Sequence, residues 1–156
     1  AQESRGLGDV YKRQHIMRDG HNNIDVKRVI SPVSVADTTA QVGQIIDRQG
    51  FDTLEYVIAT GSLGDADATF TVLLEESDDS GMSGANAVDD KYLLGTEVLA
   101  AFQFDDDNEC RKLGYIGNKR YTRLTITPVA NASAALLSAV AILGKPANIP
   151  TPNPPV

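Results

Sequence analysis

The sequence predicts an all-β protein, an antiparallel β-sandwich of the jelly-roll type with seven or eight strands and extended terminal arms. Three observations lead to this prediction. Apolar and polar residues alternate with a period of two in several short segments. Clusters of Gly, Asn and Asp separate these segments, and helical spacing of apolar residues is nearly absent. Many short strands joined by such turns are typical of two packed antiparallel sheets.

The clearest strand is predicted over residues 120–127, where Thr122, Leu124 and Ile126 share one face. The same alternation predicts two further strands, one through Phe70, Val72 and Leu74 and one through Leu54, Tyr56 and Ile58. Each of these three segments is expected to bury one face and to expose the other.

Weaker patterns predict the remaining strands, over 26–35, 41–48, 93–104 and 113–116. The pattern over 93–104 fits either one strand or a strand split in two. Pro32 makes 26–35 an edge or bulged strand. Residues 134–143 fit both a helical stripe and an alternating strand. We favour the strand there, because sheet neighbours usually override weak helix propensity.

The chain divides into a central domain and two arms. Residues 24–145 are expected to form the sandwich, and 1–23 an N-terminal arm. Within that arm, the DVYKRQ part of 4–14 resembles a translated sequencing adapter, which would make Met17 the initiator. Residues 146–156 contain five of the seven prolines and are expected to form an extended C-terminal arm.

Length, charge and cysteine content exclude several classes of protein. A chain of 156 residues holds one domain of ordinary size. The net charge of -7 repels phosphate backbones and anionic lipids, so neither nucleic acid nor membrane is an expected partner. A single cysteine, Cys110, excludes an internal disulfide and a thiolate zinc cluster.

Charge is concentrated in two stretches of opposite sign. Residues 61–109 contain thirteen acids and one base, whereas 111–123 carry five bases without an acid: Arg111, Lys112, Lys119, Arg120 and Arg123. One interpretation is that acidic loops maintain solubility and basic side chains protect strand edges from aggregation. The other is that the two stretches form complementary patches that fix contacts between copies or with an underlying lattice.

Candidates for metal binding and catalysis are weak. Residues 105–109 form a dense oxygen cluster suited to calcium, yet the glycine and distal glutamate of an EF-hand are missing, so a solvated acidic turn is favoured. No histidine follows His21, so a catalytic triad lacks its base. Cys110 has both acidic and basic neighbours in the sequence, which do not favour a reactive thiolate. The sequence also contains no tryptophan. We therefore expect no enzyme, no catalytic residue, no cofactor and no metal.

Four segments resemble a family of tailed-bacteriophage virion proteins encoded among the head genes. They are 29–79, LLGTE at 93–97, KLGYIGNKRYTRLTITPVANASA at 112–134, and SAVAILGKPANIPTPNPPV at 138–156. The most specific part is the Gly-Tyr-Ile-Gly turn followed by Lys-Arg-Tyr at 119–121.

The resemblance implies a β-sandwich that decorates or cements the outside of a phage head, made in the bacterial cytoplasm. Its implied partners are the major capsid protein or other virion proteins and further copies of itself, with a trimer favoured. The predicted interface comprises Arg111, Lys112, Lys119, Arg120, Tyr121, Arg123, Pro150, Pro152, Pro154 and Pro155. The alternative is a calcium-assisted, carbohydrate- or receptor-binding sandwich of a head fibre or tail.

Overall fold

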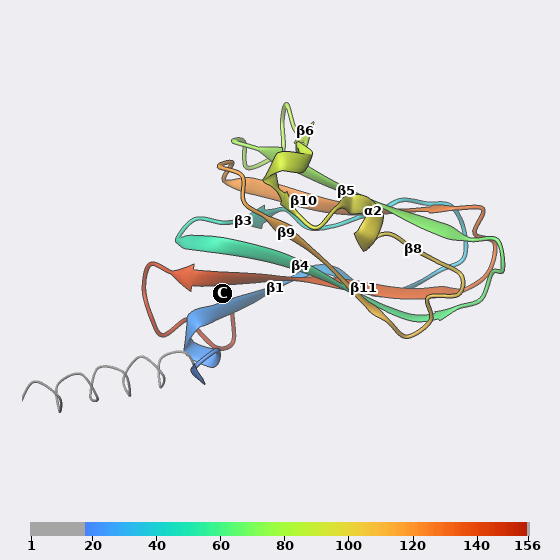
Figure 1. Ribbon diagram of the computed structural model, residues 1–156, viewed down its shortest axis with the longest axis horizontal. Helices are drawn as coiled ribbons and strands as arrows, with labels where there is room; N and C mark the ends of the chain where they lie inside the picture. The colour runs from blue at the N-terminus through green and yellow to red at the C-terminus, as the bar shows by residue number, and fades with distance from the viewer. Residues whose placement is uncertain (1–17, 156) are drawn as a thin grey trace, which may run out of the picture.

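Two antiparallel sheets pack face to face in the computed structural model, which describes residues 18–155 (Figure 1). The first, sheet A, has the strand order β1 (Ile24–Val35), β11 (Ala135–Pro146), β4 (Phe51–Leu63), β9 (Cys110–Tyr115) and β7 (Leu93–Leu94). The second, sheet B, has the order β2 (Gln41–Val42), β10 (Tyr121–Val129), β5 (Thr69–Ser77) and β6 (Asn86–Ala87), with β3 (Ile46–Asp47) also pairing with β10 and β8 (Phe102–Gln103) with β5. The remaining elements are short: η1 (His21–Asn23), η2 (Asp90–Tyr92) and α2 (Glu97–Ala100). The β-sandwich prediction is confirmed.

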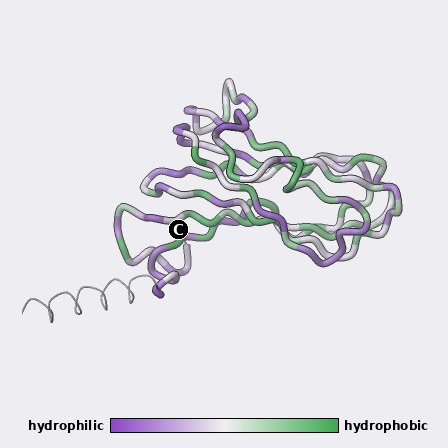
Figure 2. The backbone as a smooth tube through the Cα atoms, viewed as in Figure 1, coloured by the Kyte–Doolittle hydropathy of each residue, from purple (hydrophilic) through white to green (hydrophobic). Residues whose placement is uncertain are grey.

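The alternating segments occupy the predicted faces. Thr122, Leu124 and Ile126 of β10 are all buried, and their neighbours in the sequence are half-buried. The central residues of β4 and β5 are also buried on alternate positions. Figure 2 shows apolar residues along the strands and hydrophilic residues in many of the turns between them.

The core lies between the two sheets and contains one hydrogen bond that joins them. The Tyr56 hydroxyl on sheet A lies 2.6 Å from the Thr122 hydroxyl on sheet B, and both residues are fully buried. Near α2, the rings of Phe70 and Phe102 stack with centroids 4.7 Å apart. The hydrogen bond joins sheet A to sheet B, whereas the stacked rings lie within sheet B, on the paired strands β5 and β8.

Edge and ambiguous strands follow the sequence prediction. β1 is the edge strand of sheet A, and its pairing with β11 shifts register between Arg28 and Val33, around Pro32. Residues 134–143 lie in a strand, β11, which pairs with β1 on one side and with β4 on the other. The helical alternative for this segment is therefore wrong.

Two predictions of elements need correction. The predicted strand at 93–104 consists of β7, α2 and β8, because Thr96 caps a helical turn by accepting a hydrogen bond from the Leu99 amide at 3.1 Å. Within residues 18–155 there are eleven strands rather than seven or eight, since β2, β3, β6, β7 and β8 contain two residues each.

The predicted ends of the domain can be followed only in part. The N-terminal segment up to Met17, with the adapter-like stretch, lies outside the described residues. At the other end β11 continues to Pro146, and the proline-rich segment follows it. None of the helices in residues 18–155 is long and apolar enough to cross a membrane.

Candidate functional site

Most of the predicted basic interface residues form ion pairs within the chain. Arg120 binds both carboxylate oxygens of Asp47 at 2.8 Å, and Arg123 binds Glu75 at 2.9 Å. Lys119 pairs with Asp78. The structure does not gather these bases into one positive patch, because each lies against an acid from a neighbouring strand or turn.

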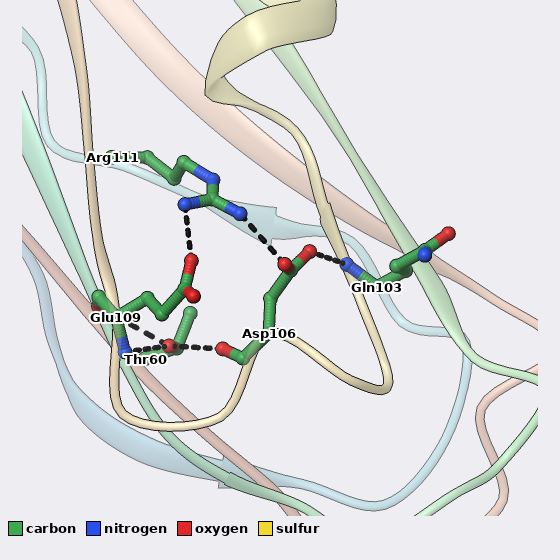
Figure 3. A network of polar contacts seen from close by, with 5 residues as sticks. All are labelled: Thr60, Gln103, Asp106, Glu109 and Arg111. Atoms are coloured by element: carbon green, nitrogen blue, oxygen red, sulfur yellow. Dashed lines mark hydrogen bonds and ion pairs between the residues drawn. The ribbon is translucent and has the colours of Figure 1, made fainter.

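Arg111 belongs to a network that closes the turn before β9 (Figure 3). Its guanidinium binds Asp106 at 2.8 Å and also Glu109. The other carboxylate oxygen of Asp106 accepts a hydrogen bond from the Gln103 amide at 2.8 Å, and the Thr60 hydroxyl donates to the Asp106 carbonyl at 2.8 Å. The network holds residues 103–111 against β4, so Arg111 has a structural partner on two sides.

Lys112 and Tyr121 have different surroundings. Lys112 is exposed on the outer side of β9 and lies near Glu55, where its charge opposes the burial that raises the pKa of the Glu55 carboxyl. Tyr121 is half-buried, and the Arg120 guanidinium lies 4.9 Å from its ring centre. Arg120 also holds the pKa of the Asp47 carboxyl below its ordinary value through a hydrogen bond.

The acidic turns use their carboxylates to hold the backbone. Asp107 accepts a hydrogen bond from the Leu63 amide at 2.7 Å, and Asp65 accepts one from the Ala132 amide, also at 2.7 Å. Asp79 accepts from the amides of Gly81 and Ser83 at 2.8 and 3.0 Å. Within residues 18–155 no three His, Cys, Asp or Glu side chains converge as a metal site would require. The acids here act as turn caps.

The Gly-Tyr-Ile-Gly turn is tied to sheet B. Arg48 donates to the carbonyls of Gly117 and Lys119 at 3.0 Å, and its guanidinium lies 4.6 Å from the ring centre of Tyr115. The Tyr115 hydroxyl donates to Glu76 on β5 and accepts from the Lys119 amide at 3.1 Å. Tyr115 is buried, and its pKa is raised by that burial and by the Glu76 carboxylate. This motif therefore links the two sheets at one end of the sandwich.

The proline-rich end folds back onto the start of β1. The Thr151 amide donates to the Asn22 carbonyl at 3.0 Å, and the Thr151 hydroxyl donates to the Ile24 carbonyl at 2.5 Å. Thr151 is 8% exposed, whereas Ile149 is 63% exposed. Four predicted interface prolines lie on this surface segment: Pro150, Pro152, Pro154 and Pro155.

Sequence reasoning missed two apolar surfaces. One is the outer face of sheet A, and the other is the exposed side of α2 with Val98 and Leu99. The first could have been recognised from residues 134–143, because a segment that is apolar on both faces fits a strand buried on both faces. The second had no clear sequence signal, since α2 lies within a predicted strand.

Comparisons with known proteins return similar structures only. No family model matches the chain, and no curated protein matches it. The PBSX exported protein XepA is 16% identical with a TM-score of 0.49, and the match covers 76% of this chain but 36% of XepA. A chain in the capsid of Ralstonia phage GP4 is 9% identical with a TM-score of 0.48, covering 81% of this chain and 87% of that one.

A third similar structure is an enzyme. Xylanase 10B of Clostridium thermocellum, in its CBM22-1 and GH10 modules, is 12% identical with a TM-score of 0.43, covering 85% of this chain and 28% of the xylanase chain. The chain thus spans about a third of the length of the first two proteins that it matches. An exported protein, a capsid chain and a xylanase have different roles, so similarity at this level does not select a function.

Proposed function

We propose that this chain is a non-enzymatic structural protein of a tailed-phage particle that binds the outside of the head, on the lattice of the major capsid protein. The sequence resemblance supports this proposal, because its most specific motif forms the structured turn held by Arg48 and Tyr115. A decoration protein needs a rigid scaffold and a surface that fits a repeated lattice rather than a reactive group.

The observation that carries the proposal is the anchored proline segment. Thr151 holds it to β1, so that Ile149 and the prolines around Thr151 are presented on the surface at one end of the sandwich. Such a segment loses little conformational entropy when it docks, because proline and the anchor already restrict it. We assign the head contact to residues 147–155.

The ion pairs change what we expect of salt. Because Arg111, Lys119, Arg120 and Arg123 already have partners within the chain, they have little unpaired charge to offer a capsid surface. Binding to heads should therefore change by less than about threefold between about 0.05 and 0.5 M salt, although this range shortens the screening length to below about 10 Å. If binding to heads fell steeply with salt, the contact would instead be made by the charged residues predicted from the sequence.

The test is co-sedimentation of the purified chain with heads assembled from the major capsid protein of the same phage. The variant Ile149→Glu places a charge on the anchored segment and should lower the number of copies bound per head at least about tenfold. Val129→Glu is the matched control, because Val129 is 48% exposed and lies at the far end of β10 from the proline segment.

Two results would overturn the proposal. If the full chain does not sediment with the heads at any concentration up to about 100 μM, a weak upper limit for a specific contact, the decoration role is wrong. If both variants bind as the unmodified chain does, the head contact is not at residues 147–155. Melting temperatures of both variants show that the fold is retained.

A further inference from the structure

The outer face of sheet A is apolar where a solvated sheet would be polar. Its half-buried or exposed apolar side chains, on β1, β11 and β4, include Val26, Val57, Ala59, Leu136, Val140 and Ile142, and Arg28, Thr53, Glu55 and Ser138 lie among them. The pairing register places Val140 directly beside Val57 and Ile142 beside Val26. β11 therefore has apolar residues on both faces, which is typical of a strand that is covered on both sides.

Sheet B shows what a solvated face looks like in the same molecule. Its outward positions on β5 and β10 carry four threonines and one ion pair: Thr69, Thr71, Thr125, Thr127 and Glu75 with Arg123. The same face also carries three exposed apolar side chains: Leu73 at 39%, Val42 at 60% and Val129 at 48%. The two faces differ in arrangement: apolar residues lie next to one another on sheet A, where Val26 pairs with Ile142 and Val140 with Val57, whereas Thr125 separates Val42 from Leu73 on sheet B.

Glycines keep the face of sheet A flat. The Leu136 side chain lies over Gly61, where an added Cβ would come within 2.8 Å of the Leu136 Cβ. Gly114 is covered in the same way by Leu94 and Glu55, at 2.9 and 2.6 Å from an added Cβ. A flat apolar face suits close packing against a second protein surface.

The exposed side of α2 forms an apolar knob, made of Val98 and Leu99, whose shape is complementary to the flat outer face of sheet A. Val98 and Leu99 are the most exposed large apolar side chains in residues 18–155, at 83% and 70%. Their position is rigid, because the Glu97 carboxylate accepts a hydrogen bond from the Leu74 amide of β5 at 2.6 Å. Thr96 caps the same turn. The helix presents two fixed aliphatic side chains to solvent, a costly arrangement for a monomer.

Within one chain α2 borders only the β9 side of this face, where Leu99 lines a hollow together with Glu55 and Lys112. A hollow of about 330 Å³ lies on the β1 side of sheet A, lined by Pro32, Ser34, Ala59 and Leu136 among others. The helix α2 lies beside β9 and β5, at the opposite side of the sheet from β1 (Figure 1). Val98 and Leu99 could therefore reach the hollow on the β1 side only on a second copy.

Charge favours the same pairing. The segment 89–109, which contains α2, carries seven acids and one base. The outer face of sheet A carries Arg28 and Lys112 against a single acid, Glu55. Three of these acids are already in ion pairs, Asp89 with Lys91 and both Asp106 and Glu109 with Arg111. The complementary charge is therefore that of the other four acids, facing Arg28 of the next copy.

We propose that the chain associates with itself head to tail, with Val98 and Leu99 of one copy docked on the outer face of sheet A of the next. Four strands spaced about 4.8 Å apart and seven residues of β11 give a face of about 460 Å², so one contact buries at most roughly 900 Å² in total. This is the low end for specific contacts. A closed ring compensates, since each copy then makes two contacts.

The test uses one variant on each surface and a mixture of the two. Leu99→Lys disrupts the knob and Val140→Lys disrupts the face; each should weaken association at least about tenfold and give a monomer by sedimentation velocity. An equimolar mixture should form a heterodimer and nothing larger, because one intact knob and one intact face remain. Leu73→Lys, on the outer face of sheet B, is the matched control and should keep the mass of the unmodified chain.

Several outcomes would overturn this inference. The unmodified chain would stay monomeric up to several hundred μM, or Leu99→Lys would keep its oligomeric mass, or the mixture would show no heterodimer. If Val140→Lys does not fold, Val140→Thr is used instead, with at least a threefold weakening expected. The assay contains no phage head, so its failure leaves the proposed head contact untouched.

Discussion

The hydrogen bond between Tyr56 and Thr122 offers a direct test of how the two sheets are held together. In Tyr56→Phe the ring keeps its place in the core, but the Thr122 hydroxyl loses its partner at a fully buried position. A buried hydroxyl left without a partner costs about 1 to 3 kcal/mol. We expect the free energy of unfolding to fall by about 2 kcal/mol, which lowers the melting temperature by roughly 4 to 8 °C for a domain of this size.

A double-mutant cycle separates this bond from other effects of the substitution. Thr122→Val should cost a similar amount, because it leaves the Tyr56 hydroxyl buried without a hydrogen-bond partner. The double variant should be more stable than the sum of the two losses predicts, by about 1 to 2 kcal/mol, since neither hydroxyl then needs a partner. Urea unfolding measures all four proteins. A loss below about 0.5 kcal/mol in Tyr56→Phe, with no coupling, would refute the reasoning.

Three further predictions concern other parts of the molecule. Arg120→Ala removes the group that lowers the pKa of Asp47. A lowered carboxyl pKa stabilises the folded chain at pH values above the ordinary pKa of 3.8, and this stabilisation disappears as the pH falls below it. The melting temperatures of the variant and the unmodified chain should therefore converge below about pH 4, and a constant gap would contradict this. Thr151→Val should speed hydrogen exchange at the amide of residue 151, which bonds to Asn22, without moving the main melting transition by more than about 3 °C; equal exchange rates would show that the hydroxyl anchor is unimportant. Leu124→Ala, at a fully buried position, should cost about 2 to 5 kcal/mol in urea unfolding, and a loss below 1 would mean that the core closes over the gap.

The strands were predictable where one face is buried and the other is wet. β10 shows this most clearly, because its alternating residues face core and solvent in turn, and this local pattern needs no knowledge of which strand lies beside it. The segment at 93–104 was less predictable. Its apolar residues suit a strand, but Thr96 caps a helical turn and Glu97 bonds to β5, a contact between residues far apart in the chain.

The order of residue types along the chain determined that it is a β-sandwich with acidic turns and a basic stretch after them. Only the tertiary structure decided how those charges are used. Arg123 meets Glu75 because β10 pairs with β5, and Arg120 meets Asp47 because β3 lies beside β10. The outer face of sheet A was likewise decided by pairing, which places apolar residues of β1, β11 and β4 side by side. Alternation along a strand is a property of neighbouring residues, whereas a surface is assembled from strands distant in sequence, and this is why the sequence determines the first and the fold the second.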